Sequence, residues 1–266
     1  MHDNSATLVY FSPTGTTRKV LKGIIEGLQA GTVHEIDLTP PSAEGYDRAL
    51  KTEGLTLIGA PVYAGRIPDT AVQRLKRLKA DKTPAVIVVV YGNRAYEDAL
   101  LELSTIVRET GFIPIAAGAF IGEHSYSTMT TPIAAGRPDP QDLDQARVFG
   151  ALIREKLERI PSLEDIQALP LPGDFPFKDP GVWPEMSPTV REDLCNRCGI
   201  CAEACPAGAI AMDTTVLTDK KRCIDCCACV KACPTGARVM EEPLIQQIAH
   251  WLSETFTQRK EPEMFV

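Results

Sequence analysis

The stretches CNRCGICAEACP at residues 195–206 and CIDCCACVKACP at residues 223–234 contain all nine cysteines of this 266-residue chain. Each stretch has the spacing C-x2-C-x2-C-x3-C-P, and the second follows the first at a constant offset of 28 residues. Eight cysteines therefore occupy equivalent positions in an internal repeat, and Cys227 falls outside it. Two equivalent thiolate loops predict a single compact unit, because small metal-binding domains gain much of their folding free energy from the bound metal.

This repeated spacing resembles that of bacterial ferredoxins, in which thiolates, as soft ligands, hold two [4Fe–4S] clusters. In that family the cysteine before the proline binds the cluster of the other copy. The resemblance therefore implies a small α+β domain with two sets of ligands that cross between the motifs. The first set is Cys195, Cys198, Cys201 and Cys233, and the second set is Cys205, Cys223, Cys226 and Cys229.

Zinc and disulfide bonds are the alternative uses of these cysteines. Cys-x2-Cys pairs also hold zinc, but a zinc ribbon needs neither a third cysteine at the same spacing nor a Cys-Pro pair. Thiols stay reduced in the cytoplasm, which we expect to be the location because residues 1–5 lack the apolar core of an export signal. We interpret Cys227 as a buried spectator, and replacement of Cys226 as a ligand stays open as the alternative.

The first 160 residues contain no cysteine and alternate strand-like with helix-like segments. Residues 86–90 are apolar on both faces, as a central parallel strand requires. The alternation predicts an α/β fold with an open, doubly wound parallel sheet covered on both sides. The expected strands are 6–11, 32–38, 55–60, 85–91 and 112–120, and the expected helices are 16–29, 68–79, 96–110 and 140–160.

Three loops follow the expected strands and carry the features of a ligand site. Residues 12–17, SPTGTT, open the first helix with hydroxyls, a glycine and backbone N–H groups suited to an anion. Ordinary helix capping is the alternative, and no G-x-x-x-x-G-K loop is present. Residues 61–66 and 91–96 each offer aromatic side chains, glycine and an arginine. Ligands bind beyond the carboxyl ends of such strands, so a flat aromatic ligand with a phosphate is predicted.

These loops resemble the FMN-binding loops of flavodoxins, and the whole chain is similar to bacterial and archaeal flavodoxin–ferredoxin fusion proteins. The resemblance implies FMN, the strand order 2-1-3-4-5 and electron transfer in anaerobic metabolism. Tyr63 would replace the tryptophan that common flavodoxins place beside the flavin. The residues implied in phosphate binding are Ser12, Thr14, Gly15, Thr16 and Thr17, and those implied around the ring are Pro61, Val62, Tyr63, Ala64, Gly65 and Arg66 on one edge and Gly92, Asn93, Arg94 and Tyr96 on the other.

Arg66 and Arg94 support a sharper hypothesis. A cation near the pyrimidine end of the flavin would favour the anionic reduced form and shift its potential. The alternative for each residue is a solvated loop arginine.

The connection from Gly122 to Asp139 is long for a compact α/β unit, and long loops are often functional. We expect either a flap over the flavin or a docking surface for the cysteine-rich module. His124 or Tyr126 could supply a proton to reduced flavin, although a single loop histidine is more often structural. Asp139 before Pro140, followed by Asp142, predicts a helix N-cap with an acidic first turn.

The remaining boundaries follow from composition. We expect a flavin domain over residues 1–160, a linker over 161–188, a ferredoxin domain over 189–242 and a C-terminal helix and tail over 243–266. Seven prolines make the linker a semi-rigid strap, which Phe175, Phe177 and Trp183 would pin to a domain. Residues 244–256 have helical spacing that is expected to pack on one of the domains through Leu244, Ile248, Trp251, Leu252 and Phe256.

The charge and hydropathy of the chain limit its partners. A net charge of −7 and a pI near 5.2 argue against nucleic-acid binding and suit redox proteins of complementary charge. No apolar stretch approaches the roughly 20 residues of a membrane span. We expect an electron carrier or adaptor between a low-potential donor and an unidentified acceptor. A flavin-dependent reductase of a small molecule is the second hypothesis, and a redox sensor is the third.

Overall fold

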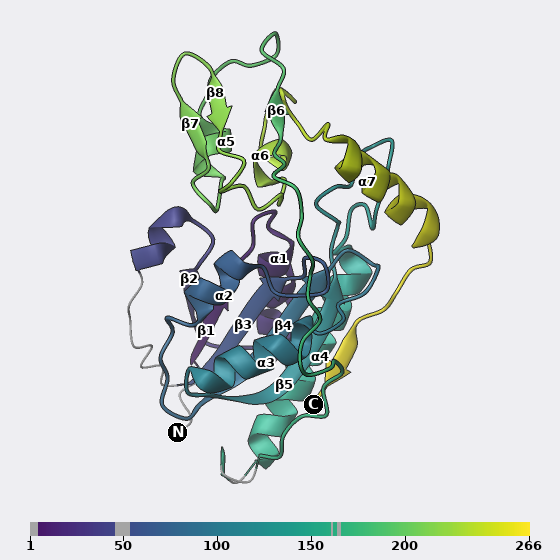
Figure 1. The fold of residues 1–266 in the computed structure, drawn as a ribbon. Helices are drawn as coiled ribbons and strands as arrows, with labels where there is room; N and C mark the ends of the chain where they lie inside the picture. The colour runs from purple at the N-terminus through teal and green to yellow at the C-terminus, as the bar shows by residue number, and fades with distance from the viewer. Residues whose placement is uncertain (1–4, 46–53, 161, 164–165) are drawn as a thin grey trace.

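The computed structural model describes residues 5–45, 54–160, 162–163 and 166–266. Its main sheet has the order β10-β5-β4-β3-β1-β2, and β1 to β5 are parallel neighbours. The predicted order 2-1-3-4-5 is therefore confirmed (Figure 1). The strands are β1 (Ser5–Tyr10), β2 (Thr32–Asp37), β3 (Leu55–Pro61), β4 (Thr83–Tyr91) and β5 (Phe112–Ile121).

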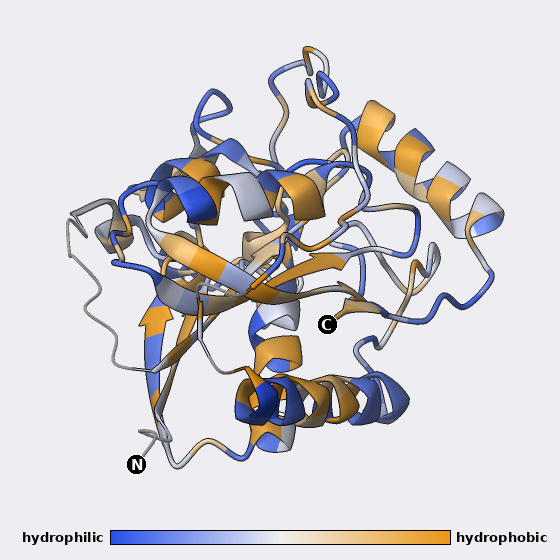
Figure 2. Cartoon of the chain, turned by 90° about the horizontal axis from the view of Figure 1, so that it is seen from below, coloured by the Kyte–Doolittle hydropathy of each residue, from blue (hydrophilic) through white to orange (hydrophobic). Residues whose placement is uncertain are grey.

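Helices cover both faces of this sheet. Figure 1 shows α2 (Asp69–Leu75) and α3 (Ala99–Glu109) over one face, and α1 (Thr16–Leu28) and α4 (Pro140–Arg159) behind the other. Each pair of helices closes a separate buried apolar cluster on its side of the sheet. In Figure 2 the apolar side of α4 faces the sheet and its polar side faces outward. A short 3-10 helix, η1 (Pro41–Gly45), follows β2. The doubly wound architecture is thus confirmed.

Two predicted helices are shorter than expected, each for a local reason. α2 ends at Leu75 because the next backbone bonds tighten to i→i−3, which turns Leu78 into the core. α3 begins at Ala99 rather than at Tyr96, because Glu97 has a φ of 43° that no α-helix accommodates. α4 begins as predicted: Asp139 and Asp142 form a reciprocal capping box.

The ferredoxin domain consists of short elements around its cysteines. It contains β6 (Thr189–Val190) paired with β9 (Arg238–Val239), and the hairpin of β7 (Ile210–Met212) and β8 (Val216–Thr218). The helices α5 (Ile200–Glu203) and α6 (Ala228–Lys231) each contain the third cysteine of one motif. Gly199 and Cys227 cap these helices with φ values of 80° and 54°, so Cys227 occupies a left-handed position that the first copy gives to glycine.

The C-terminal segment ties the two domains together. Of the predicted apolar face of α7 (Pro243–Thr255), Leu252, Ile248 and Phe256 pack with Ile133 as expected, whereas Leu244 and Trp251 are exposed and Ile245 and Ala249 are buried in their place. The chain then returns to the first domain as β10 (Glu263–Phe265), which pairs antiparallel with β5. This edge strand was not predicted, because three residues carry too little periodicity to indicate a strand.

The proline-rich strap lies against the flavodoxin-like domain. Asp98 accepts hydrogen bonds from the backbone N–H groups of Asp174 and Lys178, at 2.9 and 2.7 Å. Of the three aromatic rings expected to pin the strap, Phe177 lies under the Arg66 guanidinium, but Phe175 and Trp183 are exposed. Backbone hydrogen bonds, rather than three buried rings, therefore hold the described part of the strap.

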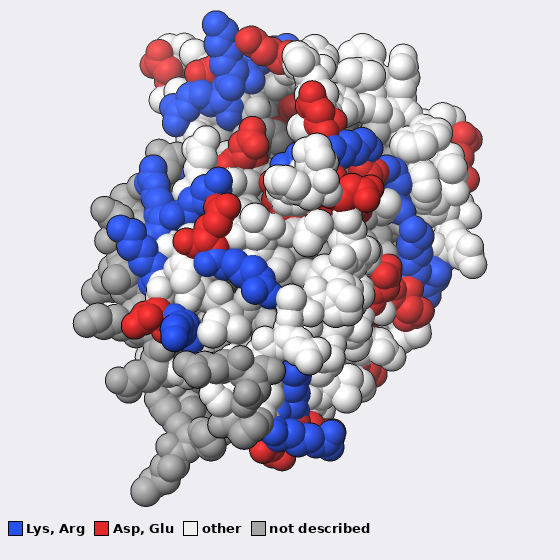
Figure 3. All heavy atoms as spheres, turned by 60° about the horizontal axis from the view of Figure 1, so that its bottom comes forward, with Lys and Arg blue, Asp and Glu red and all other residues white. Residues whose placement is uncertain are grey.

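None of the helices in the described ranges is both long enough and apolar enough to cross a bilayer. On the face seen in Figure 3, lysine and arginine side chains are interspersed with aspartate and glutamate. Exposed ion pairs elsewhere in the described ranges include Arg147 with Glu26 and Arg159 with Glu155. This face therefore carries mixed charge rather than the single-sign surface that nucleic acid would require.

Candidate iron–sulfur and flavin sites

The eight repeat cysteines line two separate cavities in the ferredoxin domain. One cavity is lined by Cys195, Cys198, Cys201 and Cys233, and the other by Cys205, Cys223, Cys226 and Cys229. We refer to them as the first and second cysteine cavities. Each combines three thiols of one motif with the Cys-Pro thiol of the other. This is the crossed grouping that the ferredoxin resemblance implied.

The thiols are arranged around a volume rather than around a point. A tetrahedral zinc site would bring sulfurs to within about 4 Å of one another around a single ion. Within the described residues, no three His, Cys, Asp or Glu side chains gather closely enough to hold one metal ion. Burial raises the pKa of the Cys223 thiol to about 12, so iron is needed to hold such a thiol as thiolate. The donor set fits two cubane clusters.

Cys227 is buried and lies against the second cysteine cavity, beside Cys226. Burial raises its pKa well above the ordinary value. The spectator role and the substitute-ligand role both remain compatible with this position.

The second cysteine cavity faces the flavodoxin-like domain. Arg74 of α2 donates from Nη2 to the carbonyl of Pro206, at 2.8 Å, and Ile224 packs against the apolar cluster beneath α2 and α3. Lys231 of α6 donates to Glu123 Oε1 at 2.6 Å and to the carbonyl of Ser127 at 2.7 Å. The long loop after β5 is thus a docking surface for the ferredoxin domain, one of the two roles expected for it.

The loop between β1 and α1 has the form of an anion site. Gly15 caps α1 in a left-handed conformation with φ 82°, and the Ser12 hydroxyl accepts from the Arg18 N–H. The Thr17 hydroxyl is fully buried and has no hydrogen-bond partner among the described residues. The first N–H groups of a helix also lack intrahelical acceptors. A phosphate at this position would satisfy both.

The loop after β3 is a tight turn, in which Tyr63 and Arg66 exchange backbone hydrogen bonds. Ala64 and Gly65 have φ values of 51° and 82°. Burial raises the pKa of Tyr63 well above its ordinary value, and the nearby Cys226 acts in the same direction. Tyr63 therefore lies near Cys226, a thiol of the second cysteine cavity.

The two arginines of the flavin loops are already paired. Arg66 forms two hydrogen bonds with the buried Glu102 carboxylate, at 2.7 and 2.8 Å, and donates to the carbonyl of Lys178. Arg94 pairs with Glu97 at 2.5 Å. Neither guanidinium is a solvated loop arginine, and a nearby carboxylate offsets the charge of each. The hypothesis of a cation near the pyrimidine end of the flavin stays a prediction for both residues.

The loop after β4 holds the C-terminal tail through its side chains. Asn93 donates from Nδ2 to the carbonyls of Phe256 and Gln258, at 2.8 and 2.9 Å. The Tyr96 hydroxyl donates to Glu263 Oε2 at 2.7 Å. Because the Asn93 and Tyr96 side chains bind the tail, the backbone of this loop, including Gly92, is what would line a flavin ring.

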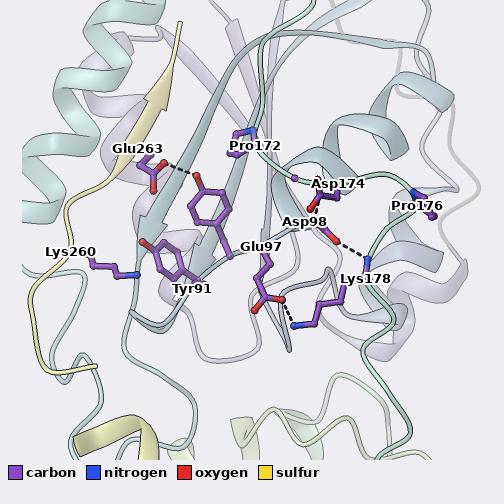
Figure 4. A pocket seen from close by; sticks show the side chains of 12 residues that line it. Tyr91, Glu97, Asp98, Pro172, Asp174, Pro176, Lys178, Lys260 and Glu263 are labelled. Atoms are coloured by element: carbon purple, nitrogen blue, oxygen red, sulfur yellow. Dashed lines mark hydrogen bonds and ion pairs between the residues drawn. The ribbon is translucent and has the colours of Figure 1, made fainter. Parts of the chain in front are cut away.

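Figure 4 shows a cavity between the strap and the tail, which Tyr96 lines. Its volume is about 710 Å³, and Tyr91 also lines it. Its carboxylates are engaged: Glu97 by Lys178, and Asp98 by the strap backbone. The cavity lies between three segments of the chain: the loop after β4, which was expected to bind flavin, the strap and the C-terminal tail.

His124 lies over Gly92, where a Cβ atom would come within 2.3 Å of its Cδ2. Its Nδ1 accepts from the Tyr126 N–H at 3.1 Å, so the neutral ring carries its proton on Nε2. Burial lowers the pKa of His124 to about 4, and Arg94 and Lys231 act in the same direction. Tyr126 packs against Ile133 in a cluster closed by α7. His124 is thus neutral near pH 7 and cannot act there as an imidazolium acid.

The lowered pKa predicts a pH dependence of stability. Between about pH 4 and the ordinary value near 6.5, the unfolded state binds a proton at His124 that the folded state does not. Stability therefore falls as pH falls through this range. Wild-type protein should lose about 2 kcal/mol of unfolding free energy through His124 between pH 6.5 and 4.5, and H124F should not show this part of the loss. Urea unfolding at a series of pH values measures it. The matched control is H34Q, because His34 is exposed. Equal pH profiles of stability for H124F and wild type would contradict the assignment.

A second prediction concerns the buried hydroxyl of Thr17. Valine has the same shape but no hydroxyl, so T17V should leave the stability of the flavin-free protein unchanged or higher. If the hydroxyl binds a phosphate dianion, FMN affinity should fall by about 10- to 100-fold, the value of one hydrogen bond to a charged group. Fluorescence titration with FMN, and with riboflavin as the phosphate-free control, measures this. An equal loss for both ligands would place the effect outside the phosphate site.

Comparison with known proteins gives one family match and several structural likenesses. Residues 188–211 and 216–239 match the family described as 4Fe-4S binding domain. No curated protein matches the chain. A flavodoxin from the domain Archaea is 18% identical, covering 58% of this chain and 99% of its own, with a TM-score of 0.39.

Two further solved structures are similar to part of the chain. The rubredoxin oxygen:oxidoreductase of Desulfovibrio gigas is 14% identical, covering 58% of this chain and 36% of its own, with a TM-score of 0.43. An NADH:FMN oxidoreductase in its apo form is 14% identical, covering 60% of this chain and 92% of its own, also with a TM-score of 0.43. We take the fold of the N-terminal domain from its strand order and that of the C-terminal domain from the family match. The chain is a fusion of a flavodoxin-like domain with a ferredoxin-type domain that has two 4Fe-4S binding segments.

Proposed function

We propose that this protein is an iron–sulfur flavoprotein that carries electrons between two [4Fe–4S] clusters and an FMN at the loops 12–17, 61–66 and 92–96. The observation that carries the proposal is the interface between the two domains, where Arg74 donates to the carbonyl of Pro206 and Lys231 donates to Glu123 and to the carbonyl of Ser127. FMN exchanges one or two electrons and a [4Fe–4S] cluster exchanges one, so the pair can connect single-electron donors to two-electron acceptors.

The residues of the chain have distinct tasks in this proposal. The α1 N-terminus and the Thr17 hydroxyl hold the phosphate. The tight turn at Ala64 and Gly65 allows a flat ring to approach the backbone. Lys231 and Arg74 fix the second cysteine cavity against this site. His124 is neutral and buried above Gly92, so it would exclude water from this site. Its Nε2–H would be able to donate a hydrogen bond without a change in the charge of the ring.

The arrangement also gives the molecule an inner and an outer end. The second cysteine cavity is covered by the flavodoxin-like domain, whereas Cys198 of the first cavity is exposed. Exposed apolar side chains accompany it, including Leu194, Ile200 and Met212. We infer that a low-potential redox partner exchanges electrons at this outer end, in the cytoplasm of an organism with anaerobic metabolism. The acidic net charge would help to select that partner.

A carrier fits the long loop after β5 better than a reductase does. A reductase would need His124 and Tyr126 to line a substrate site. Instead, Tyr126 packs against Ile133 and α7, and the loop is engaged by Lys231. The reductase remains the second candidate only if a small molecule displaces these contacts.

The test is anaerobic reconstitution of the full chain followed by quantification of iron, sulfide and flavin. About eight irons and one FMN per chain are expected, and a stepwise reductive titration gives the order in which the centres accept electrons. Protein that binds only zinc, or that takes up clusters but no flavin, would overturn the proposal. Reoxidation of the reduced protein by a small molecule, but not by redox proteins, would favour the reductase.

A further inference from the structure

The two copies of the cysteine repeat differ at a buried position beside the clusters. Ile210 and Arg238 are equivalent by the 28-residue offset, and each begins a short strand, β7 and β9 respectively. Ile210 is the apolar residue that such a position normally accommodates, because burying a charge is costly unless it is paired. Arg238 is nevertheless only 3% exposed.

The Arg238 side chain contacts both cysteine cavities. Its Nη2 donates to Thr218 Oγ1 at 2.9 Å and to Cys229 Sγ, a thiol of the second cavity, at 3.7 Å. The same side chain lines the first cavity together with Cys201. Its Nε is buried and has no hydrogen-bond partner among the described residues. One guanidinium therefore lies between the two cluster sites with part of its donor capacity unused.

No carboxylate in the described part of the chain forms an ion pair with Arg238, although a guanidinium remains charged in proteins. Its counter-charge must therefore come from the thiolates and the clusters they hold. The Nη2 of Arg238 donates to the sulfur of Cys229 in the second cavity, and the same side chain lines the first cavity beside Cys201. The cation thus acts on one ligand from each cavity.

We propose that Arg238 is a positioning and tuning residue whose buried charge raises the reduction potentials of both [4Fe–4S] clusters, and more strongly that of the second. The proposal rests on the two-cluster function given above. Reduction adds one electron, and hence one negative charge, to a cluster while the donor loses that electron. A nearby cation stabilises the reduced state, as does a hydrogen bond to a ligand sulfur.

The asymmetry of the contacts has a directional consequence. Only the second cluster would receive the hydrogen bond from Nη2 at its ligand Cys229. Its potential is therefore raised relative to that of the outer cluster, which favours movement of an electron inward, toward the flavin loops. Ile210 supplies no such charge, so the effect belongs to one copy of the repeat.

The test compares R238I, which restores the repeat, with R238Q and R238K in the reconstituted full chain. Redox titration monitored by electron paramagnetic resonance gives the potential of each cluster. R238I and R238Q should lower the equilibrium constant for reduction of the second cluster at least tenfold, or about 59 mV for one electron, and that of the first cluster less. The cluster potentials of R238K should lie between those of R238I and R238Q and those of wild type. The control is R222M, which removes an exposed arginine that donates to the carbonyl of Ala207.

Each outcome decides the proposal. Shifts below twofold in R238I and R238Q, or shifts matched by R222M, would overturn it. If R238I and R238Q lose iron while R238K keeps it, the charge compensation is supported directly, because charge distinguishes these variants. Loss of iron from all three variants would point to the shape of the guanidinium and overturn the role of its charge. Failure of wild-type protein to bind clusters would instead refute the proposed function.

Discussion

Exchange of Cys205 for serine should abolish the second cluster, although Cys205 belongs to the first motif. The physical reason is the crossed arrangement of the cavities, in which Cys205 faces Cys223, Cys226 and Cys229. A serine hydroxyl is a harder and far less acidic ligand than a thiol, so it cannot replace a thiolate on iron. Iron content should fall from about eight to about four per chain.

The decisive comparison is between pairs of variants. C205S and C226S should lose the same spectroscopic signal, and C195S and C233S should lose the other. C227S serves as the matched control, since Cys227 is a buried cysteine of the same cavity that lies outside the repeat, and it should retain both clusters. If C205S shared its defect with C195S instead, each cluster would be bound by one motif alone. Loss of a cluster in C227S would assign Cys227 as a ligand.

Replacement of Arg74 by methionine should loosen the interface between the two domains. Arg74 is 2% exposed and donates from Nη1 to the carbonyls of Leu38 and Thr39, and from Nη2 to that of Pro206. Methionine fills similar space but leaves these buried carbonyls without donors, at about 1–3 kcal/mol each. We expect a loss of roughly 3 kcal/mol or more and a fall in Tm of about 6–12 °C for a chain of this size.

Thermal unfolding and limited proteolysis of the strap measure this effect. The matched control is R77M, three residues further along, where the arginine is exposed. Because Pro206 follows the cluster ligand Cys205, R74M should also slow reduction of flavin by the clusters in stopped-flow experiments. Equal Tm values and equal rates for R74M and R77M would show that Arg74 does not couple the domains.

The sequence predicted the parts of this protein that depend on local pattern. Residues 85–90 of β4 are all apolar because they are buried on both faces, and this makes a central strand recognisable without any knowledge of its neighbours. The cysteine motifs are equally local, since a cluster binds three thiols of one short loop. Residues 12–17 were predicted to follow a strand and open a helix, and Gly15 is the N-cap of α1.

Side-chain roles in the flavin loops depended on partners that are distant in the chain. Arg66 looked available for a ligand, but Glu102 and Lys178 bind it. Asn93 looked like a ring contact, but its amide holds the tail at Phe256 and Gln258. No local pattern around either residue encodes these pairings, because they form only when α3, the strap and the tail pack together.

The sequence by itself determined two cluster-binding motifs, an alternating α/β domain and the loops at the carboxyl ends of its strands, since spacing and periodicity over a few residues specify each of them. Only the tertiary structure decided which cysteine cavity faces the flavin loops, that β10 closes the sheet edge beside β5, and that Arg238 lies between the two cavities. Those features depend on contacts between buried surfaces and polar groups that are far apart in the chain. Some partners are more than a hundred residues apart, and others belong to different copies of the repeat. That matching is a property of the packed molecule.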